Sequence, residues 1–281
     1  MFDKETREVI ESICDSTSSL FVAALIAADD GNRDKCIENY EKMFASGEKT
    51  EKGIVSEEDF LGLVFVPVKD AIPGFYSGLI KSIEHMAVEP FVRELCEVLD
   101  EFYEEDDFDD KVDLLSSLLT NYPENTNLNA IAGDLFFYEK NWGQAIEHLE
   151  KCVDKEDLFV LEETNVLDKL SRAFLKESRY VDTIRACEKL FDIEPSANTL
   201  ARLGHAQYMM NGLDEAIETF KKCLEMDAHI SAANDLAKAY AFSGRVDELR
   251  TYIENPPVPL RKYTMEIAER ALSERSENGN Q

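Results

Sequence analysis

Large apolar residues recur three or four positions apart along most of the chain, with polar residues between them. Positions at this spacing share one face of an α-helix, which turns once every 3.6 residues, so the pattern predicts amphipathic helices. Short polar segments separate these stretches, and proline or glycine marks several of their ends. The pattern therefore predicts an all-α protein.

The helical pattern also repeats in pairs of helices. Segments 200–204 and 214–217 align with segments 129–133 and 143–146, and in both pairs a small residue follows a glycine at the same offset. That offset also joins Ala24 to Cys36, Leu99 to Lys111, Ser171 to Thr183 and Ala237 to Leu249. Most intervals between successive pairs are close to a period of about 34 residues, which is typical of a helix–turn–helix repeat.

The clearest unit resembles the tetratricopeptide repeat family. Its first helix has the large, large, small pattern of the family, and its second helix has the small, aromatic, small pattern, in the residues Leu200, Leu203, Gly204, Ala216, Phe220 and Cys223. Small side chains allow two antiparallel helices to approach closely, and large ones build a face that neighbouring pairs bury. The resemblance implies an all-α, right-handed superhelical solenoid of antiparallel helix pairs.

The repeat pattern divides the chain into five parts. We expect an N-terminal helix and first repeat in 1–50, a divergent helical pair bent by proline in 51–91, and consecutive repeats in 92–255, starting near 92, 126, 164, 197 and 230. Residues 256–275 are predicted to form a proline-rich linker and a capping helix that covers the last apolar face. A polar, disordered tail is predicted for 276–281.

Charge and hydropathy restrict the class of partner. The 58 Asp and Glu exceed the 30 Lys and Arg, for a net charge of −28, which disfavours nucleic acid and anionic lipid surfaces. The longest apolar stretch, 60–68, is shorter than the roughly 20 residues that a membrane-spanning helix needs. The first residues lack a secretory signal pattern, so we expect a cytoplasmic protein without a membrane partner.

No motif for catalysis, a cofactor or a metal is apparent. The six cysteines form no Cys-x-x-Cys pair and are interpreted as buried small hydrophobes, and the four histidines fall in different repeats. The acidic residues 100–110 lack the glycine and ligand order of an EF-hand calcium loop, which favours a solvated acidic turn. We therefore expect neither enzymatic activity nor a cofactor.

The resemblance further implies a concave groove lined by the first helices, and it places the residue after each small residue in that groove. These positions carry Asp100, Asp134, Arg172, His205 and Lys238, of which the last three are basic or titratable. Positions seven before and three or four after this row add polar and aromatic groups. The predicted ligand-binding residues are Asn165, Arg172, Lys176, Asn198, His205, Tyr208 and Lys238.

Two functions remain open on the sequence alone. The first is a protein-interaction module or adaptor that binds a peptide or protein segment in the groove, with an acidic or carboxylate-ended partner as the sharper hypothesis. The alternative is a structural protein that forms a homodimer through the apolar region 60–76. A requirement for solubility alone would also explain the charges at these groove positions.

Overall fold

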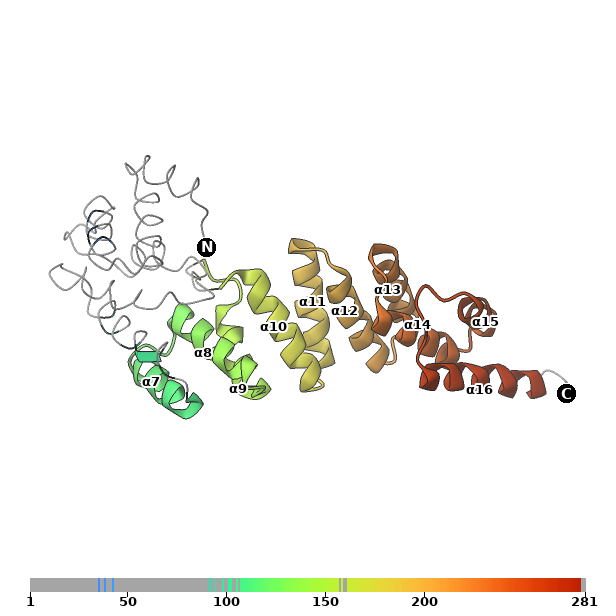
Figure 1. Ribbon diagram of the computed structural model, residues 1–281, viewed down its shortest axis with the longest axis horizontal. Coiled ribbons are helices and arrows are strands. Elements are labelled where there is room, and N and C mark those ends of the chain that lie inside the picture. The colour runs from blue at the N-terminus through green and yellow to red at the C-terminus, as the bar shows by residue number, and fades with distance from the viewer. Residues whose placement is uncertain are drawn as a thin grey trace. The chain divides into compact units, whose positions relative to one another are not determined.

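The computed structural model describes residues 107–156, 158 and 161–278, together with positions 35, 38, 42, 91, 94, 98, 101, 102 and 105. All secondary structure among these residues is helical, which confirms the predicted fold class (Figure 1). The helices are α7 (Phe108–Asn121), α8 (Thr126–Tyr138), α9 (Trp142–Leu149), the short 3-10 helix η1 (Glu150–Cys152), α10 (Glu163–Lys176), α11 (Tyr180–Ile193), α12 (Ala197–Met209), α13 (Leu213–Met226), α14 (Ile230–Ser243), α15 (Val246–Glu254) and α16 (Lys262–Asn278).

The chain divides into two compact units. Unit 1 comprises residues 1–132 and 154–162, and unit 2 comprises residues 133–153 and 163–281. In the described part of unit 1, the Asp107 carboxylate caps α7 by accepting hydrogen bonds from the backbone N–H groups of Asp109 and Asp110. The apolar region 60–76 and the cysteines at 14, 36 and 96 lie outside the described residues, as does the predicted first repeat apart from positions 35, 38 and 42.

Unit 2 is a row of antiparallel helices in which each helix packs on its neighbours in sequence (Figure 1). The first helix of each pair also contacts the first helix of the next, so that α10, α12 and α14 lie side by side. A continuous core runs from α11 to α16 and includes the fully buried Phe220 together with Leu236, Tyr240 and Leu249. Burial of such side chains between helix pairs is the main stabilising contribution in a helical-repeat array.

Gly133 and Gly204 each face a large side chain of the following helix at close range. A Cβ atom added at Gly204 of α12 would lie 2.7 Å from Cε1 of Phe220 in α13. An added Cβ at Gly133 of α8 would lie 2.5 Å from Cγ of Leu149 at the end of α9. Both glycines therefore make room for a large side chain sixteen positions later, which gives the small residue in the pattern a steric reason.

The turn inside each helix pair uses the same backbone conformation. Lys140, Ser178, Asn211 and Gly244 have φ between 57° and 71°, in the left-handed region. The residue after each of them donates a backbone hydrogen bond to a carbonyl five positions earlier, at 2.8 to 3.0 Å. This bond closes the first helix in the manner of a Schellman motif, which usually employs glycine.

The last helix, α16, packs against α14 and α15. Thr264 and Ala268 of α16 are buried, and the backbone N–H of Arg261 donates to the Asn234 side-chain oxygen at 2.8 Å. This helix lies where the C-terminal cap was predicted, and its capping role stays a prediction. It ends at Asn278 and so includes part of segment 276–281, for which a disordered tail was predicted.

Candidate functional site

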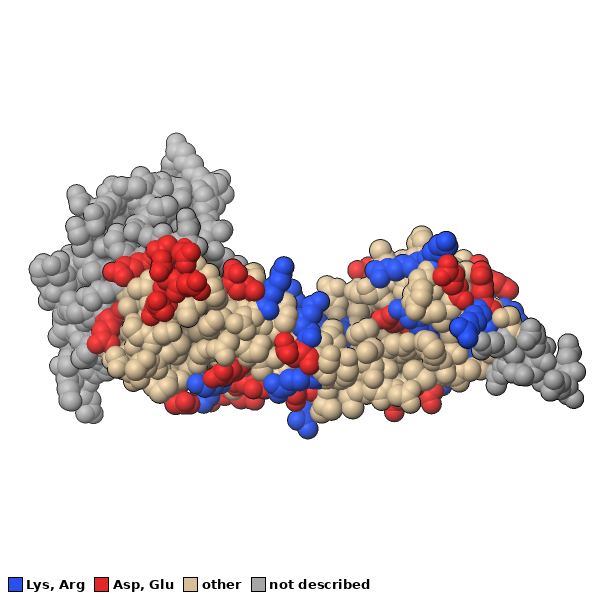
Figure 2. Space-filling view, turned by 90° about the horizontal axis from the view of Figure 1, so that it is seen from below, with Lys and Arg blue, Asp and Glu red and all other residues tan. Residues whose placement is uncertain are grey.

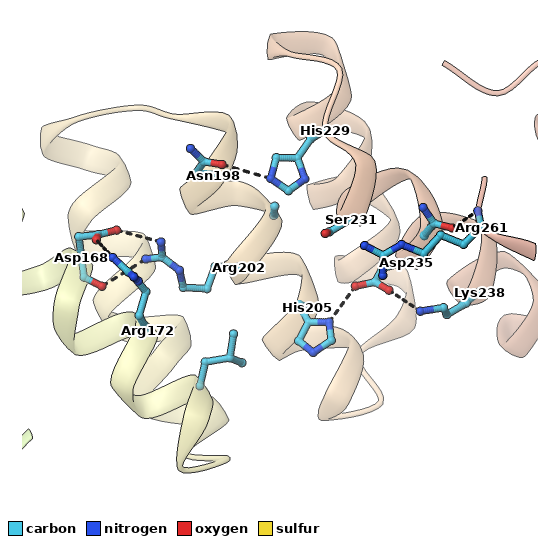
Figure 3. A pocket seen from close by; sticks show the side chains of 13 residues that line it. Asp168, Arg172, Asn198, Arg202, His205, His229, Ser231, Asp235, Lys238 and Arg261 are labelled. Atoms are coloured by element: carbon cyan, nitrogen blue, oxygen red, sulfur yellow. Dashed lines mark hydrogen bonds and ion pairs between the residues drawn. The ribbon is translucent and has the colours of Figure 1, made fainter. Parts of the chain in front are cut away.

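An open groove of about 680 Å³ runs across the first helices of unit 2 (Figure 3). It is lined by residues of α10, α12 and α14 and by Arg261, which precedes α16. Most of the lining side chains are polar or charged: Asp168, Arg172, Asn198, Arg202, His205, His229, Ser231, Asn234, Asp235, Lys238 and Arg261. These residues are separated by up to about 90 positions in sequence, and the regular stacking of the helices brings them together.

A row of charged residues at the base of the groove joins each first helix to the previous one. Lys169 Nζ of α10 lies 3.0 Å from Asp134 Oδ1 of α8, and Arg202 Nη2 of α12 lies 2.8 Å from Asp168 Oδ1 of α10. Asp235 occupies the corresponding position of α14. These side chains are largely buried, and breaking such a pair would leave a costly unpaired charge.

The Asp168 carboxylate is shared by two arginines (Figure 3). Arg202 binds one carboxylate oxygen, and its other terminal nitrogen donates to the Ser171 hydroxyl. Arg172 Nη1 lies 3.3 Å from the second carboxylate oxygen, and its guanidinium stacks 4.8 Å from the centroid of the Phe137 ring. The Arg172 side chain is still 52% exposed, so its guanidinium remains accessible from the groove.

The Asp235 carboxylate is also shared by two partners. His205 Nδ1 donates to one oxygen at 2.8 Å, and Lys238 Nζ donates to the other at 2.8 Å (Figure 3). Burial by itself raises the pKa of this carboxyl, but the hydrogen bonds from His205 and Lys238 outweigh that effect and hold the pKa below its ordinary value. Asp235 is therefore an ionised centre that fixes the orientation of both basic groups.

His229 and Asn198 line the groove near the start of α14. His229 is the N-cap of α14, and its Nδ1 accepts a hydrogen bond from the backbone N–H of Ala232 at 3.2 Å. Because Nδ1 is the acceptor, Nε2 carries the proton and donates it to Asn198 Oδ1 at 3.2 Å. This residue pair links α12 to α14 through the neutral form of the imidazole.

The groove has an excess of positive charge in a strongly acidic protein. Arg172, Arg202, Lys238 and Arg261 line it together with only two carboxylates, Asp168 and Asp235. The Arg261 side chain extends into the groove from the segment before α16 (Figure 3). Acidic side chains of unit 1 gather instead over the region of α7 (Figure 2).

The structure brings four of the seven predicted ligand-binding residues into the groove lining, namely Arg172, Asn198, His205 and Lys238. Asn165, Lys176 and Tyr208 are outside that lining, although the Tyr208 ring lies 6.4 Å from the His205 ring. Sequence reasoning missed the residues that hold the predicted ones in place or complete the lining: Asp168, Arg202, His229, Asp235 and Arg261.

The described residues outside the groove include three cysteines. Cys152, Cys187 and Cys223 are buried, and burial raises the pKa of Cys187 and of Cys223 to about 11. No group of three or more metal-binding side chains occurs in the part of the chain that the structure describes. In that same part, every helix is too short or too polar to cross a membrane.

Comparison with known proteins agrees with this architecture. The tetratricopeptide repeat model matches residues 197–229, which comprise α12 and α13. A solved structure of Naa15/Naa10 bound to HypK-THB superposes with a TM-score of 0.51 at 12% identity, covering 94% of this chain and 35% of that one. A crystal structure of MamA is also similar, with a TM-score of 0.45 and 20% identity, covering 65% of this chain and 96% of that one. The crystal structure of yeast Tom70 has a TM-score of 0.44 and 13% identity, covering 92% of this chain and 46% of that one. No curated protein matches the sequence.

Stacked antiparallel helix pairs with a shared groove along their first helices define a helical-repeat solenoid. One unit of this array, residues 197–229, matches the tetratricopeptide repeat model, which confirms the resemblance drawn from residues 200–223. At 12% identity the Naa15/Naa10 structure supports the fold alone, so the function must be argued from the groove itself.

Proposed function

We propose that this protein is an interaction module whose unit 2 groove binds an acidic peptide or protein segment. The observation that carries the proposal is the excess of Lys and Arg over carboxylates in the groove lining, within a chain of net charge −28. If solubility alone placed the charges, the groove would share the acidic character of the whole chain. A local excess of the opposite sign favours a ligand that complements it.

The side chains of the groove suit the recognition of carboxylates. A guanidinium donates two parallel hydrogen bonds to a carboxylate, and both Arg172 and Arg261 have guanidinium groups accessible to a ligand. Arg202 remains on Asp168 when Arg172 turns toward a ligand, so Asp168 keeps a partner. Asn198 and Ser231 add polar groups that can bind the backbone of an extended segment.

Repulsion from the rest of the molecule limits the strength and the rate of binding. The acidic surface repels an acidic ligand at long range, whereas the groove attracts it at contact distance. Salt at about 0.1 M screens exposed charges beyond about 10 Å, so the long-range repulsion is reduced under such conditions. At moderate ionic strength the long-range repulsion is weakened while the contacts in the groove persist, so we expect measurable binding. Raising the salt concentration further should weaken the contacts in the groove and lower the affinity.

Binding of a fluorescent peptide tests the proposal directly. The probe is a peptide of repeated Glu-Glu-Ser units, followed by fluorescence anisotropy. The variant Arg172→Ala with Lys238→Ala should bind this peptide at least about tenfold more weakly, which corresponds to about 1.4 kcal/mol.

The matched control is Arg185→Ala with Lys221→Ala, which removes two exposed positive charges from the second helices α11 and α13. This control should bind the peptide with nearly wild-type affinity. Equal weakening in both double variants would show that only net charge matters and would refute groove binding. Circular dichroism on each variant verifies that the helices are retained.

Self-association through residues 60–76 has no support from the described residues, because that region lies outside them. Light scattering at increasing protein concentration remains the test of this alternative.

A further inference from the structure

We infer that the segment bound in the groove carries large apolar side chains beside its carboxylates, and that one edge of the groove holds them. This inference rests on the proposed function and adds a second chemical requirement to the partner. The edge consists of Tyr138, Met209 and Phe242, which stand beside the groove lining and not in it, and it is called the apolar edge below.

The apolar edge follows the period of the repeat. Met209 and Phe242 each stand four positions after a groove residue, at the end of α12 and near the end of α14. Tyr138 stands four positions after Asp134, at the end of α8, which is the equivalent place in the repeat. Lys176 takes the corresponding position of α10. The three apolar side chains are 67%, 46% and 61% exposed, although burial is the usual state for residues of this size. Their exposure at equivalent positions indicates a surface and not three isolated residues.

Ring contacts connect the apolar edge to the charged base of the groove. The Lys169 ammonium lies 5.7 Å from the centroid of the Tyr138 ring. Tyr208 bridges the two parts at the other end, because its ring centroid lies 6.4 Å from that of His205 and 6.3 Å from that of Phe242. A ligand bound by the cations of the groove is therefore within reach of the apolar edge.

The spacing of the helices indicates the form of the ligand. Helices in contact lie about 8–10 Å apart, and α10, α12 and α14 contact one another in order. A polyproline II segment advances about 3.1 Å per residue and returns to the same side every third residue, which gives about 9 Å between equivalent side chains. An extended segment with one apolar residue in every three matches this spacing, and its remaining positions are free for carboxylates.

Other exposed apolar residues provide a control surface. Ile193 and Met226 end the second helices α11 and α13 and are 49% and 48% exposed, close to the value for Met209. They differ from the apolar edge in position, because they lie on second helices and the groove is lined by first helices. If nonspecific hydrophobic contact explained the binding of an apolar peptide, this pair would contribute as much to the affinity as the apolar edge.

Three peptides separate the contributions of charge and apolar surface. The probes are labelled repeats of Glu-Glu-Phe, Glu-Glu-Ser and Lys-Lys-Phe, titrated with the full chain and followed by anisotropy. Glu-Glu-Phe should bind at least about tenfold more tightly than Glu-Glu-Ser. Lys-Lys-Phe can bind the acidic surface of the chain outside the groove, and its affinity should not fall in the Arg172→Ala, Lys238→Ala variant. Met209→Ser with Phe242→Ser should abolish the gain from Phe while leaving the affinity for Glu-Glu-Ser within about twofold.

The control variant, Ile193→Ser with Met226→Ser, should retain the full gain from Phe. The inference is overturned if Glu-Glu-Phe and Glu-Glu-Ser bind equally, if the Met209 and Phe242 variant keeps the gain, or if the control loses it equally. The proposed function would still hold in each of these cases if Glu-Glu-Ser binds and its binding depends on Arg172 and Lys238. If neither acidic peptide binds, the proposed function and the inference both fail.

Discussion

Gly204 in α12 offers a quantitative test of how the repeat packs. Replacing it with Ala adds one methyl group, whose carbon would lie 2.7 Å and 2.8 Å from Cε1 and Cδ1 of Phe220. Carbon atoms in favourable contact are about 3.5–4.0 Å apart, so the ring would have to move by roughly 0.8 Å. Phe220 is fully buried in the continuous core, and its neighbours prevent such a movement without further rearrangement.

Two effects of opposite sign determine the result for Gly204→Ala. Alanine is favoured over glycine in a helix interior by about 1 kcal/mol, whereas overpacking a core costs about 1–3 kcal/mol. The steric cost exceeds the helical gain because the contact is well below van der Waals distance on a side chain without free space. We expect a net loss of about 1 kcal/mol in the free energy of unfolding, or about 2–4 °C in melting temperature.

Gly143→Ala is the matched control, because no atom lies within 4 Å of the added Cβ in α9. It should leave the melting temperature unchanged or raise it, when thermal unfolding is followed by circular dichroism at 222 nm. In the Gly204→Ala background, Phe220→Leu should cost less stability than it does in the wild type, since the smaller side chain relieves the contact. Equal melting temperatures for Gly204→Ala and Gly143→Ala would refute the argument.

Two further predictions concern titratable groups. Cys152, Cys187 and Cys223 should resist a thiol-labelling reagent near neutral pH until urea unfolds the chain. All three are buried, and burial raises the pKa of Cys187 and Cys223 to about 11. Labelling of the native protein at the rate of a free cysteine, measured by peptide mapping with mass spectrometry, would contradict this prediction. Burial lowers the pKa of His148, so the folded state binds fewer protons there than the unfolded state, and the associated stability is present above about pH 6.5 and lost as pH falls below it. The melting temperature of the wild type should accordingly fall relative to that of His148→Gln between about pH 7.5 and about pH 5, whereas parallel curves would exclude a contribution from His148.

The helix pairs were predictable from sequence because their cause is local. Apolar spacing sets each helical face, and a small residue such as Gly204 must stand opposite a large one such as Phe220. The turn conformation was less visible, since Lys140 and Ser178 adopt a left-handed backbone that usually selects glycine. There the fixed geometry of the two helices overrides the local preference of the residue.

The groove was only partly predictable, for a physical reason. The period of the repeat located Arg172, His205 and Lys238, but it does not reveal which charges they meet. Part of that signal was present, because Asp168 precedes Arg172 by four positions and Asp235 precedes Lys238 by three, so each pair shares a helical face. Arg202 and Arg261 reach the groove through packing between helices, which no spacing within one helix records.

Packing restricted to near neighbours in sequence also affects how unit 2 is made. The contacts of each helix of unit 2 involve segments that the ribosome produces within a few helices of one another. Low contact order of this kind favours rapid folding, and it allows each new pair to settle on the preceding one during synthesis. The segment containing Arg261 and α16 emerges after α10 to α15. Both Arg261 and the helix that covers α14 are therefore added after the other groove residues, and a nascent chain that has not yet reached Arg261 has an incomplete groove.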